Sequence, residues 1–185
     1  MGPSGQTRFY KLESSTFQLL PGASVELIAV TDKLAMFFMI SVEQELLFGV
    51  LSDKALETFQ RIDSRVFSIS AHAALSAVKS ATNQVHIATV QDNGDLYVLR
   101  IIDEKSQWKF VEKNFLCKAG SKAYFSEERD RWMVNPFSDL QITVKDTRVS
   151  VLAAAMNANN GAGLVRFMPN ERPEILLCVK DCGLQ

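Results

Sequence analysis

Two histidines are the residues of this chain with the broadest catalytic range, because imidazole titrates near neutral pH. His72 lies between alanines, near Ser70 and Ser76, and His86 starts an alternating apolar segment. Nucleophilic catalysis needs an oriented base beside the nucleophile, and neither a Gly-x-Ser-x-Gly elbow nor a local Cys-His signature is present. We therefore expect no catalytic residue and no enzyme, with His72 in a turn and His86 at the surface or a strand edge.

Acidic pairs could support acid–base chemistry or bind a hard cation. They occur at Asp92/Asp95, Asp103-Glu104 and Glu127-Glu128, each within a hydrophilic turn. The run from Asp92 to Asp95 resembles half of a calcium loop, but no Glu follows at the loop spacing. Gly161-Ala162-Gly163 lacks the Lys-Ser/Thr of a phosphate-binding loop. We expect hairpin turns and a loop tip here, with no metal and no cofactor.

The three cysteines are Cys117, Cys178 and Cys182. Their odd number and sparse spacing favour free buried thiols in a reducing compartment, which predicts a cytoplasmic or nuclear protein. A zinc site at Cys178 and Cys182 would need two further ligands. We expect Cys178 to be a core residue at the end of an apolar strand.

Charge and composition exclude several classes of protein. The 185 residues carry 20 basic and 21 acidic side chains, a formal net charge of −1 that gives no global attraction to nucleic acid or anionic membranes. No apolar run approaches the roughly 20 residues of a membrane span. The hydrophobic fraction of 47% is that of a folded domain. We expect a tail over residues 1–20, no secretory signal in its polar opening, and one domain over 21–185.

One cluster combines basic and aromatic residues. Arg129, Arg131 and Trp132 follow Lys118, Lys122 and Tyr124, but Glu127, Glu128 and Asp130 dilute the positive charge, so the pattern does not favour nucleic acid. Trp and Arg dominate the energetics of protein interfaces. We predict contacts with a partner at Arg129, Arg131, Trp132 and Phe137, the alternative for Trp132 being core packing.

Short apolar or alternating runs, separated by turn residues, dominate the chain from residue 25 onward. The strongest hairpin joins residues 85–90 and 96–102 across Asp92-Asn93-Gly94. The pattern predicts a mainly β fold of antiparallel hairpins and meanders, propeller-like or sandwich, with at most one or two short helices. Segments 34–40, 55–62 and 72–80 are ambiguous between helix and strand. Further strands are expected at 25–30, 45–51, 66–69, 108–115, 132–134, 140–145, 149–155, 164–168 and 174–179.

Turns centred on Asp53, Asp92 and Asp139 recur at roughly the interval of one propeller blade. The segments LFGVLSDKALETFQ, HIATVQDNGDLYVLR and WMVNPFSDLQITVK resemble the inner hairpins of degenerate WD-repeat blades, although no Trp-Asp or Gly-His pair is present. The resemblance implies a small or partial β-propeller over residues 25–180. An incomplete array exposes sheet edges, which predicts a scaffold or interaction module that binds a protein partner or itself.

Two alternatives remain open. Residues 67–102 look like part of a DNA sliding-clamp domain if 72–80 is helical, which would imply a nucleic-acid-associated factor, although the candidate helix offers only Lys79 to a phosphate channel. The second alternative is a structural, capsid-type β subunit, which would form large symmetric assemblies.

Overall fold

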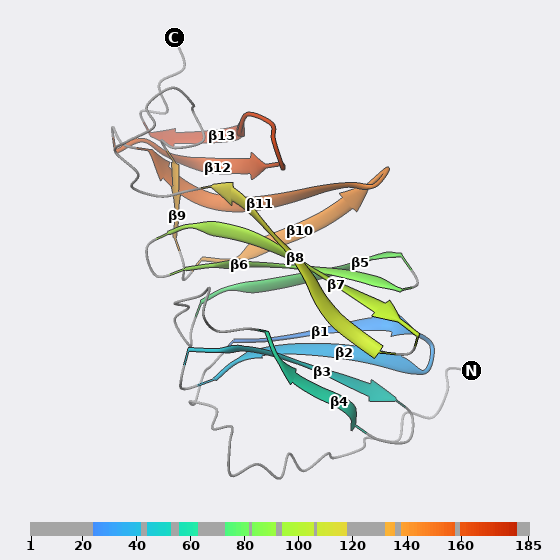
Figure 1. Cartoon of the computed structure of the whole chain (residues 1–185). Helices are drawn as coiled ribbons and strands as arrows, with labels where there is room; N and C mark the ends of the chain where they lie inside the picture. The colour runs from blue at the N-terminus through green and yellow to red at the C-terminus, as the bar shows by residue number, and fades with distance from the viewer. Residues whose placement is uncertain are drawn as a thin grey trace, which may run out of the picture.

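The computed structural model describes residues 24–41, 44–52, 56–62, 73–81, 83–91, 94–105, 107–117, 132–135, 138–157 and 160–180. These residues form thirteen β-strands and no helix (Figure 1). The first sheet contains β1 (Val25–Thr31), β2 (Leu34–Ile40), β3 (Leu46–Ser52) and β4 (Leu56–Arg61). The second contains β5 (Leu75–Ala81), β6 (Gln84–Val90), β7 (Leu96–Glu104) and β8 (Gln107–Cys117). The third contains β9 (Trp132–Val134), β10 (Leu140–Lys145), β11 (Arg148–Asn157), β12 (Ala162–Phe167) and β13 (Glu174–Lys180).

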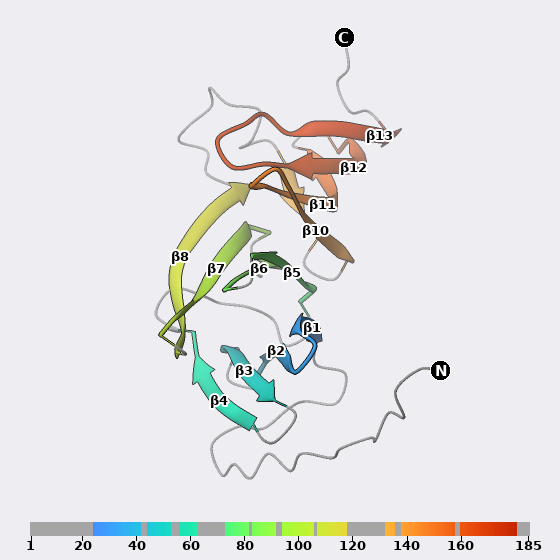
Figure 2. The ribbon, with the colours of Figure 1, turned by 90° about the vertical axis from the view of Figure 1, so that its right-hand side faces the viewer.

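Each sheet is an antiparallel meander in which strands consecutive in sequence pair with one another, apart from β9, which pairs with β11. The three sheets stack, with the first and third on opposite sides of the second (Figure 2). Their leading strands pack against one another, β1 on β5 and β5 on β10. The stack is open, because the first and third sheets each keep one face turned away from the second.

The leading strand of the third sheet is interrupted. Both β9 and β10 pair with β11, β9 through Trp132–Val134 and β10 through Leu140–Lys145. The amide of Asn135 still donates to the carbonyl of Ala154, at 3.4 Å, which keeps the interrupted strand on β11.

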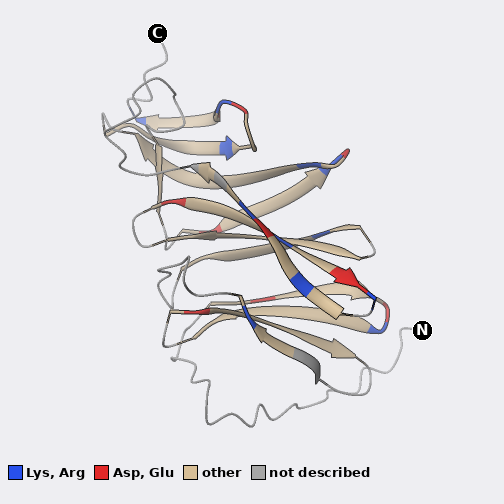
Figure 3. Ribbon diagram, in the orientation of Figure 1, with Lys and Arg blue, Asp and Glu red and all other residues tan. Residues whose placement is uncertain are grey.

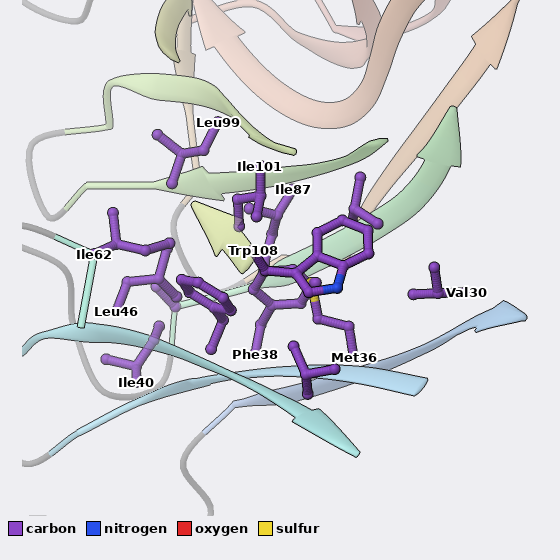
Figure 4. Close-up of a cluster of buried hydrophobic side chains, with 14 residues drawn as sticks. Val30, Met36, Phe38, Ile40, Leu46, Ile62, Ile87, Leu99, Ile101 and Trp108 are labelled. Carbon is purple, nitrogen blue, oxygen red and sulfur yellow. The ribbon is translucent and has the colours of Figure 1, made fainter. Parts of the chain in front are cut away.

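Two apolar clusters hold the three sheets together. The first and second sheets meet around Phe38, Phe48, Ile87 and Trp108 (Figure 4). The second and third meet around Val98, Trp132, Val151 and Phe167, among others. Side chains alternate between the two faces of a strand, so β6 supplies Val85 and Ile87 to one cluster and Ala88 and Val90 to the other. The second sheet is therefore apolar on both faces.

The face of the first sheet turned away from the second is also apolar. Phe37, Met39 and Leu47 are buried there, and the rings of Phe37 and Phe59 stack with centroids 5.8 Å apart. Phe37 lies against Gly49, the residue that it opposes on β3. A side chain at position 49 would collide with that ring.

The mainly β, antiparallel prediction is confirmed, and the ambiguous segments resolve as strands wherever they are described. Residues 34–40 form β2, 56–61 form β4 and 75–81 form β5. A strand at 75–81 removes the helix on which the sliding-clamp interpretation depended. The predicted strand at 66–69, the tail over 1–20 and His72 lie outside the described residues, and the single domain over 21–185 stays a prediction.

The Asp-centred turns do not mark equivalent positions in the three sheets, so the repeating unit predicted from them was wrong. Asp53 falls between the third and fourth strands of its sheet, Asp92 between the second and third, and Asp139 just before the leading strand β10. These positions are not equivalent. The repeating unit is a four-stranded meander, and its equivalent turns differ in sequence.

Candidate protein-binding surface

The second turn of each sheet has the same backbone geometry. The residue that opens the turn donates its N–H to the carbonyl four residues on, as Ser41 to Glu45, Gln91 to Asp95 and Asn157 to Gly161, at 2.8–2.9 Å. Its own carbonyl accepts from the fourth residue of the turn, which has a positive φ at Gln44, Gly94 and Asn160. All three turns lie on the same side of the stack, at the left in Figure 1.

Side-chain hydrogen bonds link one leading strand to the next. The carboxylate of Glu26 on β1 accepts from the backbone N–H of Ala77 on β5, at 3.2 Å. The hydroxyl of Ser76 on β5 accepts from the N–H of Ile142 on β10, also at 3.2 Å. The first and second sheets therefore each supply one acceptor to the sheet that follows in sequence.

A cleft of about 530 Å³ lies where the three leading strands begin. The residue before each strand and the first two residues of the strand line it: Ser24, Val25, Glu26, Ala74, Leu75, Ser76, Asp139, Leu140 and Gln141. Carboxylates, hydroxyls and one amide face the cleft, and no Lys, Arg or aromatic residue is among its lining. The cleft therefore suits a ligand rich in hydrogen-bond donors.

A polar cluster fixes the second turn of the second sheet. The buried hydroxyl of Tyr97 donates to the side chains of Gln91 and Asp95, the latter at 3.3 Å. The ammonium of Lys113 lies over the Tyr97 ring. Burial, and then the charge of Asp95, raises the pKa of Tyr97, while burial lowers the pKa of Lys113 to about 8 against the opposing effect of Asp95. These groups satisfy one another, so we assign the cluster to the stability of the turn.

His86 lies in the face of the second sheet that packs toward the third. It opposes Arg100 on β7, which opposes Glu112 on β8, and the Arg100–Glu112 ion pair spans 2.8 Å. Burial and the charge of Arg100 lower the pKa of His86, and Glu112 opposes this shift. His86 is 7% exposed, so its expected place at the surface or a strand edge was wrong. A period-two pattern does not separate an edge strand from a strand buried on both faces.

The third sheet carries apolar residues on both faces. On β11, Val151, Ala153 and Ala155 face the second sheet, and the alternate positions Ala154 and Met156 point away. We define the terminal face as the outward-pointing apolar residues of β11, β12 and β13: Ala154, Met156, Ala162, Leu164, Leu177 and Val179.

The terminal face is open to solvent. Met156 is 45%, Leu177 58% and Val179 73% exposed, and a shallow apolar cavity of about 280 Å³ lies among them. Charged residues of the third sheet lie near the ends of its strands (Figure 3). At the rim of the terminal face, Arg166 and Glu174 pair at 2.8 Å. Antiparallel sheets that face water usually alternate apolar and polar residues, and this face does not.

Of the four predicted contact residues, the structure describes Trp132 alone. Trp132 is 5% exposed and packs in the cluster between the second and third sheets, the alternative weighed for it from the sequence. Arg129, Arg131 and Phe137 lie outside the described residues, so their contact roles stay predictions. Sequence reasoning missed the terminal face, although the unbroken apolar stretch Ala153–Met156, with no polar residue at either alternate position, could have indicated it.

Cys178 is disulfide-bonded and exposed, so its expected place as a free core thiol was wrong. The side chains of the other two cysteines, Cys117 and Cys182, lie outside those described. The prediction of a cytoplasmic or nuclear protein rested on free thiols, and it loses this premise at Cys178.

Within the part of the chain that the structure describes, no three His, Cys, Asp or Glu side chains are grouped to hold a metal ion. The same part contains no helix long and apolar enough to cross a bilayer.

No family model and no curated protein matches the sequence. The fold is similar to that of the BP39L lectin from Burkholderia pseudomallei, with a TM-score of 0.55 and 11% identity. That alignment covers 85% of this chain and 41% of the lectin, so the chain spans about two fifths of the lectin's length. A fucose lectin from Kordia zhangzhouensis aligns at a TM-score of 0.41 and 10% identity, over 77% of this chain and 90% of that one, which supports no conclusion.

Proposed function

We propose that this chain is a non-enzymatic interaction module built as a partial propeller-like array, and that it binds a protein partner through the terminal face. The observation that carries the proposal is the exposure of Leu177 and Val179 on the outward face of the last sheet. The equivalent outward-facing positions of the second sheet, such as Ala88 and Val98, are covered by the third.

The physical argument is the cost of leaving apolar surface in water. Burial of such surface stabilises by roughly 25 cal/mol per Å², and contiguous exposed apolar patches mark interaction sites on soluble proteins. The Arg166–Glu174 pair at the rim is already neutralised, so a partner could cover the face without stranding an unpaired charge. A polar rim around an apolar centre is the usual anatomy of a protein interface.

The test compares proteins cross-linked to the full chain with those cross-linked to a Leu177→Glu/Val179→Glu variant. Both side chains are exposed, so the variant should fold, as circular dichroism and thermal unfolding would check. We expect the partner to be lost, because two carboxylates in the interface would have to be desolvated.

Val111→Glu is the matched control, since Val111 is an exposed apolar residue on β8, outside the terminal face. This variant should keep the partner. Retention of the partner by the double variant, or equal loss in the control, would exclude the terminal face as the binding surface.

Carbohydrate binding is a second candidate function, favoured by the likeness of the fold to that of a lectin. The cleft at the start of the leading strands offers Glu26, Asp139 and Gln141 to sugar hydroxyls. A glycan microarray probed with the full chain and with Asp139→Ala would test it. Binding that Asp139→Ala abolishes would support a sugar site in the cleft, and no binding by the full chain would reject it.

A further inference from the structure

The two end faces of the stack differ in how far they are covered. On the first sheet, the outward-facing Phe37, Met39 and Leu47 are only 8%, 3% and 0% exposed. On the third sheet, Leu177 and Val179 of the terminal face are open to solvent. A second copy therefore cannot continue the stack by placing its first sheet on the terminal face. Two open faces of the same kind cover each other when they pack together, which gives a closed pair with two-fold symmetry.

The terminal face has a raised part beside a hollow part. Leu177 and Val179 are the most exposed apolar side chains of β13 and form the raised part. The hollow part is the apolar cavity of about 280 Å³, whose lining includes the small residues Ala154, Ala155, Ala162 and Gly163 of β11 and β12. The raised strand of one copy therefore fits the hollow of another, and a symmetric pair makes this fit twice.

The pairing of β12 with β13 decides which residues such a symmetry brings together. On the outward face, Leu164 opposes Leu177 and Arg166 opposes Glu174. A two-fold axis that runs parallel to these strands and midway between them exchanges β12 with β13. Each outward residue then faces, in the second copy, the residue that it opposes in its own sheet.

This axis brings complementary groups together. Leu164 lies against Leu177 of the second copy, so apolar surface covers apolar surface. Arg166 and Glu174 pair at 2.8 Å within one copy, and each also faces the opposite charge of the second copy. The four charges alternate in sign, so the terminal face is complementary to itself in charge as well as in shape.

We propose that two copies of this chain pack their terminal faces on each other about this axis, with Leu177 of each copy in the hollow of the other and Arg166 facing Glu174. The inference rests on the proposed function and names the partner. Sheets that pack face to face keep their strands within about 30° of each other, so the strands of the two copies cross at a small angle. Both open faces are used in this contact, and the assembly stops at two copies.

Charge reversal tests the contact between Arg166 and Glu174. In a symmetric pair, Arg166→Glu gathers four carboxylates at the interface and Glu174→Arg gathers four cations. Light scattering over a concentration series should show a dimer for the unmodified chain, and self-association weaker by about tenfold or more for each variant alone. An equimolar mixture of the two variants should restore the dimer, because every carboxylate then faces a guanidinium of the other copy.

Glu104 and Lys109 provide the matched control. They form an exposed ion pair at 3.4 Å between β7 and β8, outside the terminal face. Glu104→Lys and Lys109→Glu should each self-associate as strongly as the unmodified chain. Restoration of the dimer in the mixture of the Arg166 and Glu174 variants also shows that both are folded, since an unfolded chain could not form the contact.

The proposal is overturned by an unmodified chain that stays monomeric at every concentration, or that grows beyond a dimer. It is also overturned by reversed variants that associate as strongly as the unmodified chain, and by a mixture that associates no better than each variant alone. The Leu177→Glu/Val179→Glu variant then decides the proposed function separately. If this variant still loses a cross-linked protein, the terminal face binds a different partner and the proposed function stands; if it loses none, both fail.

Discussion

The ammonium nitrogen of Lys113 lies 3.8 Å from the centre of the Tyr97 ring, on the neighbouring strand of the second sheet. The ring face attracts the cation, yet partial burial opposes its charge and lowers the pKa of Lys113 from 10.5 to about 8. The contact therefore leaves a lysine that loses its proton more readily in the folded state than in the unfolded chain.

This difference predicts that the free energy of unfolding rises between pH 8 and pH 10. In that range the unfolded chain binds more protons at Lys113 than the folded protein does. Above pH 10 the trend reverses at Tyr97, whose raised pKa keeps a proton on the folded state. Urea unfolding across this range should show the rise in the unmodified protein and in Lys109→Met, and its loss in Lys113→Met. If the free energy of unfolding depended on pH in the same way in all three proteins, the rise could not be assigned to Lys113.

A second pH effect is expected at His86. Its lowered pKa keeps the buried imidazole neutral in the folded protein, while the unfolded chain takes up a proton near pH 6.5. Stability should therefore fall as the pH drops from 7.5 to 5.5, and the fall should be smaller in His86→Gln. Urea midpoints at the two pH values measure this, and an unchanged pH dependence in the variant would show that His86 does not cause it.

Gly94 is the glycine on which one turn depends. Its φ is +86°, and a methyl group there would meet Met133 and, at 3.2 Å, the carbonyl oxygen of Val134. Gly94→Ala should lower the free energy of unfolding by about 2 kcal/mol, combining left-handed strain with overpacking. Asn160→Gly changes the equivalent position of the third sheet and should alter stability by less than about 0.5 kcal/mol. Chemical denaturation compares the two, and equal effects would refute the role given to Gly94.

Ser76→Ala removes the acceptor that joins β5 to β10. The N–H of Ile142 would then lose its partner in a partly buried place, at a cost of about 1 kcal/mol. Ser150→Ala is the control, because Ser150 shares its hydrogen bond with Thr143 in an exposed pair. Thermal unfolding should separate the two variants. A Ser76→Ala midpoint equal to that of Ser150→Ala would show that the hydrogen bond between Ser76 and Ile142 does not stabilise the stack.

The strands were largely predictable from sequence, because their apolar runs end at strong turn formers. Asp92-Asn93-Gly94 placed β6 and β7 correctly, and Asn135-Pro136 marked the break before β10. The segment at 75–81 was ambiguous because its alanines and lysine are good helix formers, and only pairing with β6 makes it a strand.

The candidate site was not predictable in the same way. The repeated turns share backbone geometry while Gln44, Gly94 and Asn160 fill the same position, so no sequence repeat marks them. The terminal face depends on which side of β11 packs against the second sheet, which alternation alone cannot say. Trp132 was predicted to contact a partner because tryptophan is common in protein interfaces. Its position in the core depends on packing between residues far apart in sequence.

The interrupted leading strand of the third sheet has a consequence for cooperativity. Because β9 is separate from β10, the amide of Val134 reaches across to the carbonyl of Gly94 in the second sheet, at 3.4 Å. The second and third sheets are thus joined by a hydrogen bond at a turn as well as through their core. The first sheet is joined to the second at its leading strand and through their core. Native-state amide exchange should show the second and third sheets opening as one unit, while the first sheet exchanges at a lower free energy of opening.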